Sequence, residues 1–325
     1  MGDPPWHDAA CSPAEPATGH RASGAGALVT RIHTYHHLRP ADRLPPRRPN
    51  VFFDPVDTEV GVWAAVDLIR PGCTVLDLGS GSGAAAAAMA RAGAGRVHGL
   101  DISEDSVAWA GEHYATESAA GRVSFGSADY SVLAPGQLRA RCPFPSAPDV
   151  IVSNPPYVPL PSPDGNPRRS IDGGGDGLRL VRRVVAHAEA LGSELAVTIG
   201  SYTSPRDAAD LLHDHGFQLS AITLGMLRLG EHTLDNIGRV SALEATGEGP
   251  LLRIDDAVPH YLVVGLSCRR RKDRGAPALP PEELLPLLQL ACRSRTPLLE
   301  TLDSASTRVP LRMVNLPDEH RRLHV

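Results

Sequence analysis

The sequence has few of the residues that mark several protein classes. Its 325 residues include only five cysteines, with no C-x-x-C pair among them, so neither a zinc site nor a disulfide framework is predicted. An odd number of scattered cysteines is typical of a reduced, cytoplasmic chain. No apolar run approaches the roughly 18 residues that a membrane span needs, and no basic-then-apolar leader opens the chain. We therefore expect no membrane partner.

An excess of positive charge is also missing. Lysine and arginine number 32 against 37 aspartate and glutamate residues, which gives a net charge of −5. This balance disfavours a protein coated in basic charge for nucleic acid. The one dense basic cluster, residues 269–274, is read as a solvated end of a domain. His33, His36 and His37 lack a second ligand cluster, so no metal site is predicted.

The composition divides the chain into three parts. Residues 1–48 are rich in proline, alanine, glycine and arginine and predict a flexible segment. Residues 49–270 carry the regular apolar pattern of a domain, interrupted by an irregular insertion at 225–258. Residues 271–325 predict a tail with one short amphipathic helix.

Seven stretches within the domain are predicted strands, and they alternate with helical patterns. They lie at residues 74–78, 96–101, 122–126, 149–153, 194–200, 218–224 and 260–266. Strands that alternate with helices predict an α/β fold, here a doubly wound, seven-stranded and mostly parallel sheet of the Rossmann-like kind. In such sheets ligands bind at the carboxyl ends of the strands. Ahead of the first stretch, Asp57 or Thr58 is placed to cap a helix.

A glycine turn follows the first of these strands. The turn runs from Gly79 through Ser80 and Gly81 to Gly83, and an alanine-rich helix comes directly after it. Glycine lets the backbone approach a ligand closely, and the helix N-terminus directs N–H groups toward it. With Ala84 the spacing also fits G-x-G-x-x-A, so an NAD-dependent oxidoreductase remains an alternative.

Acidic residues end the next two strands. Asp101 lies 18 residues after Gly83, which suits a carboxylate that binds ribose hydroxyls, although it could equally cap the helix that starts near Glu104. Asp129 and Tyr130 end the third strand, where an adenine amine could lie.

The fourth strand ends in Asn154-Pro155-Pro156-Tyr157. Two prolines fix their own φ and donate no N–H, so the chain leaves the sheet as a rigid corner. The corner presents an amide, backbone carbonyls and an aromatic ring, which are the groups that hold a flat, amine-bearing ligand. The long, glycine-rich segment 158–177 after it is typical of a functional lid.

This order of motifs resembles the class I S-adenosylmethionine-dependent methyltransferases. Asn-Pro-Pro-Tyr resembles the branch that methylates planar nitrogens, and residues 54–59 and 171–178 look like the flanking motifs of the HemK-type protein-glutamine N5-methyltransferases. That family modifies the Gly-Gly-Gln tip of peptide-release factors. The likeness covers residues 50–224 and resumes at 260–268.

The resemblance implies an enzyme with S-adenosyl-L-methionine as its cofactor. It implies catalytic roles for Asn154, Pro155, Pro156 and Tyr157. The residues that it implies at the cofactor are Thr58, Asp77, Gly79, Ser80, Gly81, Gly83, Asp101, Ile102, Asp129, Tyr130 and Asn154.

Three alternatives to the protein-glutamine substrate or to catalysis stay open. The acceptor could be a nucleobase in DNA or RNA, which the net charge does not favour, or a small metabolite. A binding module with a vestigial catalytic corner is the non-enzymatic alternative, and the intact glycine turn and Asn154 argue against it.

Overall fold

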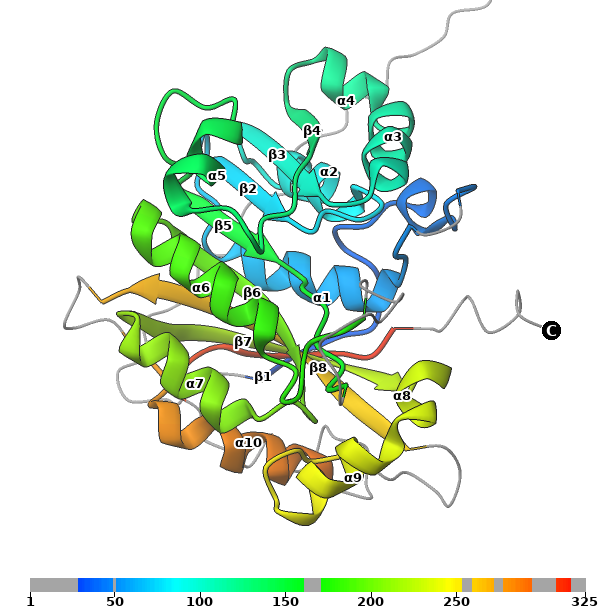
Figure 1. Cartoon of the computed structure of the whole chain (residues 1–325), viewed down its shortest axis with the longest axis vertical. Coiled ribbons are helices and arrows are strands. Elements are labelled where there is room, and N and C mark those ends of the chain that lie inside the picture. Colours follow the sequence, from blue (N-terminus) through cyan, green and yellow to red (C-terminus); the bar gives the residue numbers. More distant parts are fainter. Residues whose placement is uncertain are drawn as a thin grey trace, which may run out of the picture.

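The structure is a computed structural model, and it describes residues 29–48, 51–160, 171–252, 259–271, 277–293 and 308–316. These residues form one α/β unit around a nine-stranded sheet (Figure 1). The strands are β1 (Val29–Ile32), β2 (Thr74–Leu78), β3 (Arg96–Asp101), β4 (Val123–Ser127), β5 (Val150–Ser153), β6 (Glu194–Gly200), β7 (Phe217–Arg228), β8 (His260–Arg270) and β9 (Leu311–Val314).

The strand order across the sheet is β1-β9-β7-β8-β6-β5-β2-β3-β4. All neighbouring pairs are parallel except the two that involve β8, which is antiparallel to both β6 and β7. The order reverses between β2 and β5, because the chain winds outward in one direction from β2 to β4 and then in the other from β5. In open α/β sheets the ligand crevice lies outside the carboxyl ends of the strands at such a reversal.

Helices cover both faces of the sheet. One face is covered by α1 (Pro55–Val66), α2 (Ala84–Arg91) and α3 (Glu104–His113), followed by the short α4 (Ala115–Ala119). The other face is covered by α5 (Pro135–Arg141), α6 (Arg179–Leu191), α7 (Pro205–Asp214) and α10 (Pro281–Arg293). Between β7 and β8 lie α8 (Glu231–Asp235) and α9 (Ile237–Ala245).

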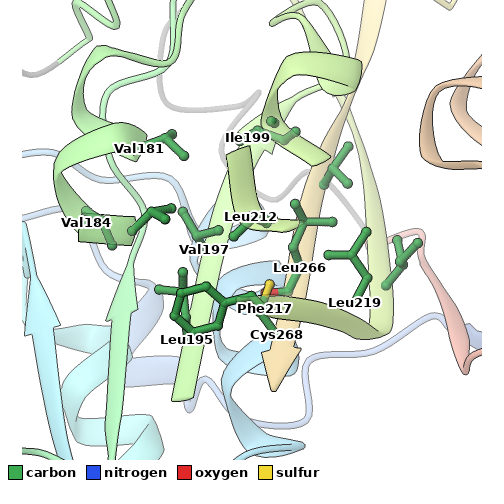
Figure 2. Packing of buried hydrophobic residues seen from close by; sticks show 14 of the residues in the cluster. Val181, Val184, Leu195, Val197, Ile199, Leu212, Phe217, Leu219, Leu266 and Cys268 are labelled. Atoms are coloured by element: carbon green, nitrogen blue, oxygen red, sulfur yellow. The ribbon is translucent and has the colours of Figure 1, made fainter. Parts of the chain in front are cut away.

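The largest part of the core lies between the sheet and the second group of helices. Figure 2 shows Val181 and Val184 of α6 on the side of Val197 of β6, with Leu195 of β6, Phe217 of β7 and Cys268 of β8 grouped together nearby. These side chains are all buried, and the cysteine is a free thiol that packs as a small apolar group. The stretches that predicted the strands thus supply the core that fixes the sheet.

The α/β prediction is confirmed, and all seven expected strands are present, but the strand count was too low. The two additional strands, β1 and β9, have four residues each and pair with one another, while β9 also pairs with β7. Strands this short carry little periodicity of their own. Their place in the sheet depends on a pairing between segments that lie about 280 residues apart in the sequence.

Parts of two segments expected to be irregular or flexible form helices and strands, while residues 1–28 and 253–258 lie outside the described residues. Within 225–258, β7 continues to Arg228, and α8 and α9 follow, with Val240 and Leu243 buried. Within residues 1–48, the chain forms β1 and a 3₁₀ helix at Pro40–Arg43. The carboxylate of Glu59, which is fully buried, accepts hydrogen bonds from the N–H groups of residues 36–38 and so holds this segment against α1.

The cap of α1 also differs from the expectation. Asp54 rather than Asp57 or Thr58 is the capping residue, because its side chain accepts hydrogen bonds from the N–H groups of Val56 and Asp57, each at 3.0 Å. The consequence is that Asp57 lies inside the first turn with its carboxyl group available for another role. In the part of the chain that the structure describes, no helix combines the length and apolar character needed to cross a bilayer.

Candidate active site

A cavity of about 900 Å³ opens at the carboxyl ends of β2 to β5, where the strand order reverses. Its wall combines the glycine turn after β2, the ends of β3 and β4, and the corner after β5. The lining residues expected from the sequence are Gly79, Gly81, Asp101, Ile102, Asp129, Tyr130, Asn154, Pro155, Pro156 and Tyr157. The fold therefore brings these separate motifs to one place.

The glycine turn adopts a conformation that glycine favours. Gly79, Gly81 and Gly83 have φ values of +78°, +51° and +80°. The N–H groups of Gly79 and Ser80 donate to the Leu100 carbonyl at 2.7 and 3.1 Å, which ties the turn to the end of β3. The turn is thereby held open toward the cavity.

Asp101 connects the turn to the cavity wall. Its Oδ2 accepts the N–H of Gly81 at 2.8 Å, and its Oδ1 accepts the N–H of Ser103 at 2.8 Å. Ser103, not Asp101, caps α3. Burial raises the pKa of Asp101, while hydrogen bonds from Ser103 and Gly81 oppose that rise. Each oxygen keeps a second lone pair for a ligand hydroxyl.

The mouth of the cavity near β4 is polar on one side and apolar on the other. Asp129 Oδ1 accepts hydrogen bonds from the N–H and hydroxyl groups of Ser131, at 3.0 and 2.5 Å. Phe52, Ile102 and Val132 line the cavity as exposed apolar side chains, with Val132 exposed by 74%. Exposed apolar groups around a concave site are typical of a surface that receives a flat ligand ring.

Buried polar atoms near the turn lack partners within the described residues. They are Asp77 Oδ2, Ser80 Oγ and the Tyr130 hydroxyl. Burial, followed by the charge of Asp101, raises the pKa of Asp77 to about 7. The carboxylates of Asp101 and Asp129 in the wall, with the unpartnered carboxyl oxygen of Asp77 close behind it, fit a ligand that carries N–H groups and positive charge, as the ammonium and sulfonium groups of S-adenosylmethionine do.

The corner after β5 is fixed by hydrogen bonds. Ser153 Oγ donates to the Leu78 carbonyl at 2.7 Å, which joins the corner to the end of β2. The Thr198 hydroxyl on β6 donates a short hydrogen bond to Asn154 Oδ1. The Asn154 amide therefore lies in a set orientation at the cavity, with one lone pair of its oxygen already used.

Tyr157 belongs to a buried polar cluster. Its hydroxyl donates to Asp57 Oδ2 at 3.0 Å and lies 3.1 Å from the Tyr261 hydroxyl. The ring of Tyr202 packs against that of Tyr261, with centroids 4.8 Å apart. The ring of Tyr157 also lies close over Gly200, where a Cβ atom would come within 3.2 Å of it.

The end of the cavity beside the Asn154 corner, called the acceptor end below, includes residues from α6 and α8. Arg179 and Arg183 of α6 line it, and Gly230, Glu231 and Thr233 line it from the other side. Arg179 is bound to Asp172, whose carboxylate lies 3.1 Å away and whose carbonyl lies 2.9 Å away. The segment 225–258 thus contributes to the wall. Half of the expected lid at 158–177, residues 161–170, lies outside the described residues.

Four of the sequence-derived site residues do not line the cavity. Asp77 lies in β2 before the turn, and the Ser80 side chain faces Gly99 of β3. Thr58 binds the Asp54 carbonyl through its hydroxyl at 2.7 Å. Gly83 faces α3 and β4, where a Cβ atom would lie 2.7 Å from Ala110 Cβ and 2.9 Å from Phe125. These positions shape or support the wall, so their direct contact with a cofactor stays a prediction.

Sequence reasoning missed several residues of the acceptor end. Tyr202 follows the end of β6. The rule that site residues follow parallel strands, which was used for Asp101 and Asn154, could therefore have identified it. Tyr261 and Thr198 lie inside strands, where only the three-dimensional pairing shows that they reach the corner. No group of three or more potential metal ligands occurs among the described residues.

Comparisons with known proteins agree with this geometry. Residues 75–154 match the family model described as a methyltransferase domain. The release factor glutamine methyltransferase of Rhodospirillum rubrum is 34% identical over 190 residues, which cover 54% of this chain and 52% of that protein. The protein of the same name from Moorella thermoacetica is 36% identical over 166 residues, covering 47% and 56%. The chain therefore matches about half the length of these relatives.

A solved structure, a putative RNA methyltransferase from Pyrococcus horikoshii, aligns with 75% of this chain and 92% of its own at a TM-score of 0.44 and 14% identity. The family match agrees with the sequence-based prediction of a methyltransferase domain. Residues 75–154 match a methyltransferase domain, in a chain that resembles the release factor glutamine methyltransferases.

Proposed function

We propose that this protein transfers a methyl group from S-adenosylmethionine to a planar nitrogen, the side-chain amide of a glutamine in a protein substrate such as a peptide-release factor. The observation that carries the proposal is the position of the Asn154 corner at the glycine-turn cavity, joined to β2 through Ser153. The names of the two curated relatives support the glutamine acceptor.

The cofactor end of the cavity would be formed by residues from the first three parallel strands. Gly79 and Gly81 would line the methionine portion, and the unpaired oxygen of Asp77 lies behind them. Asp101 would bind the ribose hydroxyls, and Asp129 the adenine amine. Phe52, Ile102 and Val132 would cover the adenine ring. When bound, the cofactor supplies an electrophilic methyl group on a positively charged sulfur.

The residues at the acceptor end must overcome the low reactivity of a substrate amide. Its nitrogen is a poor nucleophile, because the lone pair is delocalised into the carbonyl group. Asn154 Oδ1 and the Pro155 carbonyl accept the N–H bonds and so turn the lone pair toward the methyl group. Positive charge develops on the nitrogen during transfer, so these fixed dipoles stabilise the transition state more than the ground state.

The prolines and Thr198 make this arrangement rigid before the substrate arrives. Pro155 and Pro156 restrict the backbone, and the Thr198 hydroxyl holds the Asn154 amide. Positioning of this kind can supply a large share of a rate enhancement, since the reacting atoms need no further ordering. The buried rings of Tyr157, Tyr202 and Tyr261 pack beside the corner and restrict its movement.

The experiment that tests the proposal follows the methyl group. Purified protein is incubated with a host lysate and S-adenosylmethionine carrying a labelled methyl group, and the protein, nucleic-acid and small-molecule fractions are separated. The proposal predicts label in protein, released as methylglutamine after enzymatic digestion. Label in the nucleic-acid fraction, with transfer that weakens steeply as salt is added, would contradict it.

A further inference from the structure

Asp57 lies at the acceptor end of the cavity, directly beside the corner. It lies in the first turn of α1, lines the cavity together with Asn154 and Tyr157, and is only 2% exposed. Because Asp54 caps the helix, Asp57 has no capping role. Its position therefore needs another explanation.

The two oxygens of Asp57 are not equivalent. Oδ2 accepts the Tyr157 hydroxyl at 3.0 Å, whereas Oδ1 has no hydrogen-bond partner among the described residues. A buried acceptor oxygen without a donor is unfavourable, so such an atom at a cavity wall points to a donor on the ligand. Tyr157 is in turn held by Tyr261, so the carboxyl group is fixed in place.

The surroundings of Asp57 make its ionised form unfavourable unless a ligand supplies a hydrogen-bond donor. Asp54 faces it from the start of the same helix, Asn154 and Tyr157 from the corner, Tyr202 from the end of β6, and Tyr261 from β8. None of these groups is cationic. Burial first, and then the charge of Asp54, raise the pKa of Asp57 to about 7, while the polar side chains of Asn154 and Tyr157 oppose the rise. An N–H group that becomes positively charged is the partner that such a carboxylate lacks.

We propose that Asp57 Oδ1 accepts one N–H of the acceptor nitrogen and takes up the proton that this nitrogen loses. This inference rests on the proposed N-methyl transfer and adds a catalytic residue to it. One N–H then goes to the Pro155 carbonyl, and the other faces Asn154 and Asp57. An acceptor without an N–H, such as a hydroxyl on a carbon or a carboxylate, cannot satisfy both sides of the site.

The step balances without a further reactant. A bond forms between nitrogen and the methyl carbon, and the bond between that carbon and sulfur breaks. Its electron pair stays on the sulfur, which loses its positive charge. The nitrogen, which gains the charge, releases its proton to the Asp57 carboxylate, and the neutral acid passes it to solvent after the product leaves.

The assignment predicts a specific pH dependence. Asp57 must be ionised, so turnover rises with pH through the pKa of its carboxyl group. That pKa is about 7 in the free protein, and the positively charged cofactor lowers it, so the rise lies at or below pH 7. Asp57→Asn keeps the shape of the side chain and removes the proton acceptor. Its turnover falls by about 10²–10⁴-fold, and the acidic limb of the profile disappears.

A matched control lies two residues along the same helix. Glu59 is also a fully buried acid of α1, but its carboxylate binds the backbone at residues 36–38 and does not line the cavity. Glu59→Gln lowers the melting temperature and keeps the acidic limb. Asp57→Asn, in contrast, retains the affinity for S-adenosylhomocysteine and the melting temperature at pH 5. Asp57→Glu, which keeps the acid, restores part of the turnover and the acidic limb.

The experiment measures labelled methyl transfer between pH 5 and pH 9 to whichever lysate fraction accepts the label. Loss of both turnover and the acidic limb in Asp57→Asn alone supports the inference. Unchanged turnover, or reduced turnover with an unchanged limb, overturns it. Label outside the protein fraction overturns the proposed substrate and leaves this test valid. Label in no fraction from the wild-type protein overturns the proposed function and the inference together.

Discussion

The hydroxyl of Thr198 donates a hydrogen bond to Asn154 Oδ1, so a residue in the middle of the sheet orients the amide at the cavity. Thr198→Val keeps the size of the buried side chain and removes this donor. We expect turnover to fall by roughly 10-fold, since about 1–3 kcal/mol of hydrogen bonding to a buried oxygen is lost and the amide can rotate. Steady-state kinetics beside calorimetry of cofactor binding would check this result.

The matched control for Thr198 is Thr223 on β7. It is equally buried, and its hydroxyl has no hydrogen-bond partner within the described residues. Thr223→Val should leave turnover and stability unchanged or slightly raise stability. Equal effects of the two substitutions would show that Thr198 contributes only packing.

Asp101→Ala should weaken the binding of S-adenosylmethionine by about 10- to 100-fold. The substitution removes charge-assisted hydrogen bonds, each worth about 1.5–3 kcal/mol, and frees the N–H of Gly81. Isothermal calorimetry measures the affinity. Asp149→Ala is the control, because Asp149 binds Thr74 at the opposite end of the strands, and its loss should leave the affinity unchanged.

Asp77 should make the ligand-free protein less stable as the pH rises. Its folded pKa is about 7, above the value of about 3.9 in an unfolded chain, so the folded state binds more protons between these values. Stability is therefore lost as the pH rises from about 4 to 7. Asp77→Asn should raise the melting temperature more at pH 8 than at pH 5, and a larger gain at pH 5 would contradict this account.

Gly83→Ala should destabilise the protein by about 1–3 kcal/mol. Its φ of +80° disfavours a side chain, and the new Cβ atom would lie 2.7 Å from Ala110 Cβ. Gly93→Ala tests the backbone effect alone, because its φ of +116° is also unfavourable but nothing lies within 4 Å of the position that a Cβ atom would take there. Urea denaturation of both variants separates the two contributions, and equal losses would mean that Gly83 has no packing role.

The core of the fold could be predicted from sequence because its strands are short, β-branched and apolar-rich stretches with clear ends that alternate with helical patterns. Leu76 and Ile151 are fully buried in β2 and β5, as their patterns indicate. The short strands β1 and β9 could not be predicted in this way, since their stability comes from pairing with each other across the sequence. Helix α9 was missed although Val240 and Leu243 have helical spacing, because it lies in the stretch 225–258 that was expected to be an irregular insertion.

In the candidate site too, residues at strand ends could be predicted from the sequence, whereas residues whose role depends on contacts between distant segments could not. Gly79, Asp101 and Asn154 each follow or end a strand, so the rule that ligands bind at the carboxyl ends of strands predicts that they meet. Asp57 and Thr198 could not be assigned, because one was expected to cap a helix and the other lies within a strand. Their roles depend on distances to Asn154 and Tyr157, which only the packed structure provides.

The central claim is that the Asn154 corner positions a glutamine amide for methylation. The most direct measurement incubates the purified protein with a peptide-release factor and S-adenosylmethionine and analyses the Gly-Gly-Gln peptide by mass spectrometry. The wild-type protein should add one methyl group to that glutamine. Asn154→Ala should bind the cofactor normally and methylate about 10²–10³-fold more slowly. An unmodified glutamine with the wild-type protein, or an Asn154→Ala variant with normal turnover and a lowered melting temperature, would contradict the account.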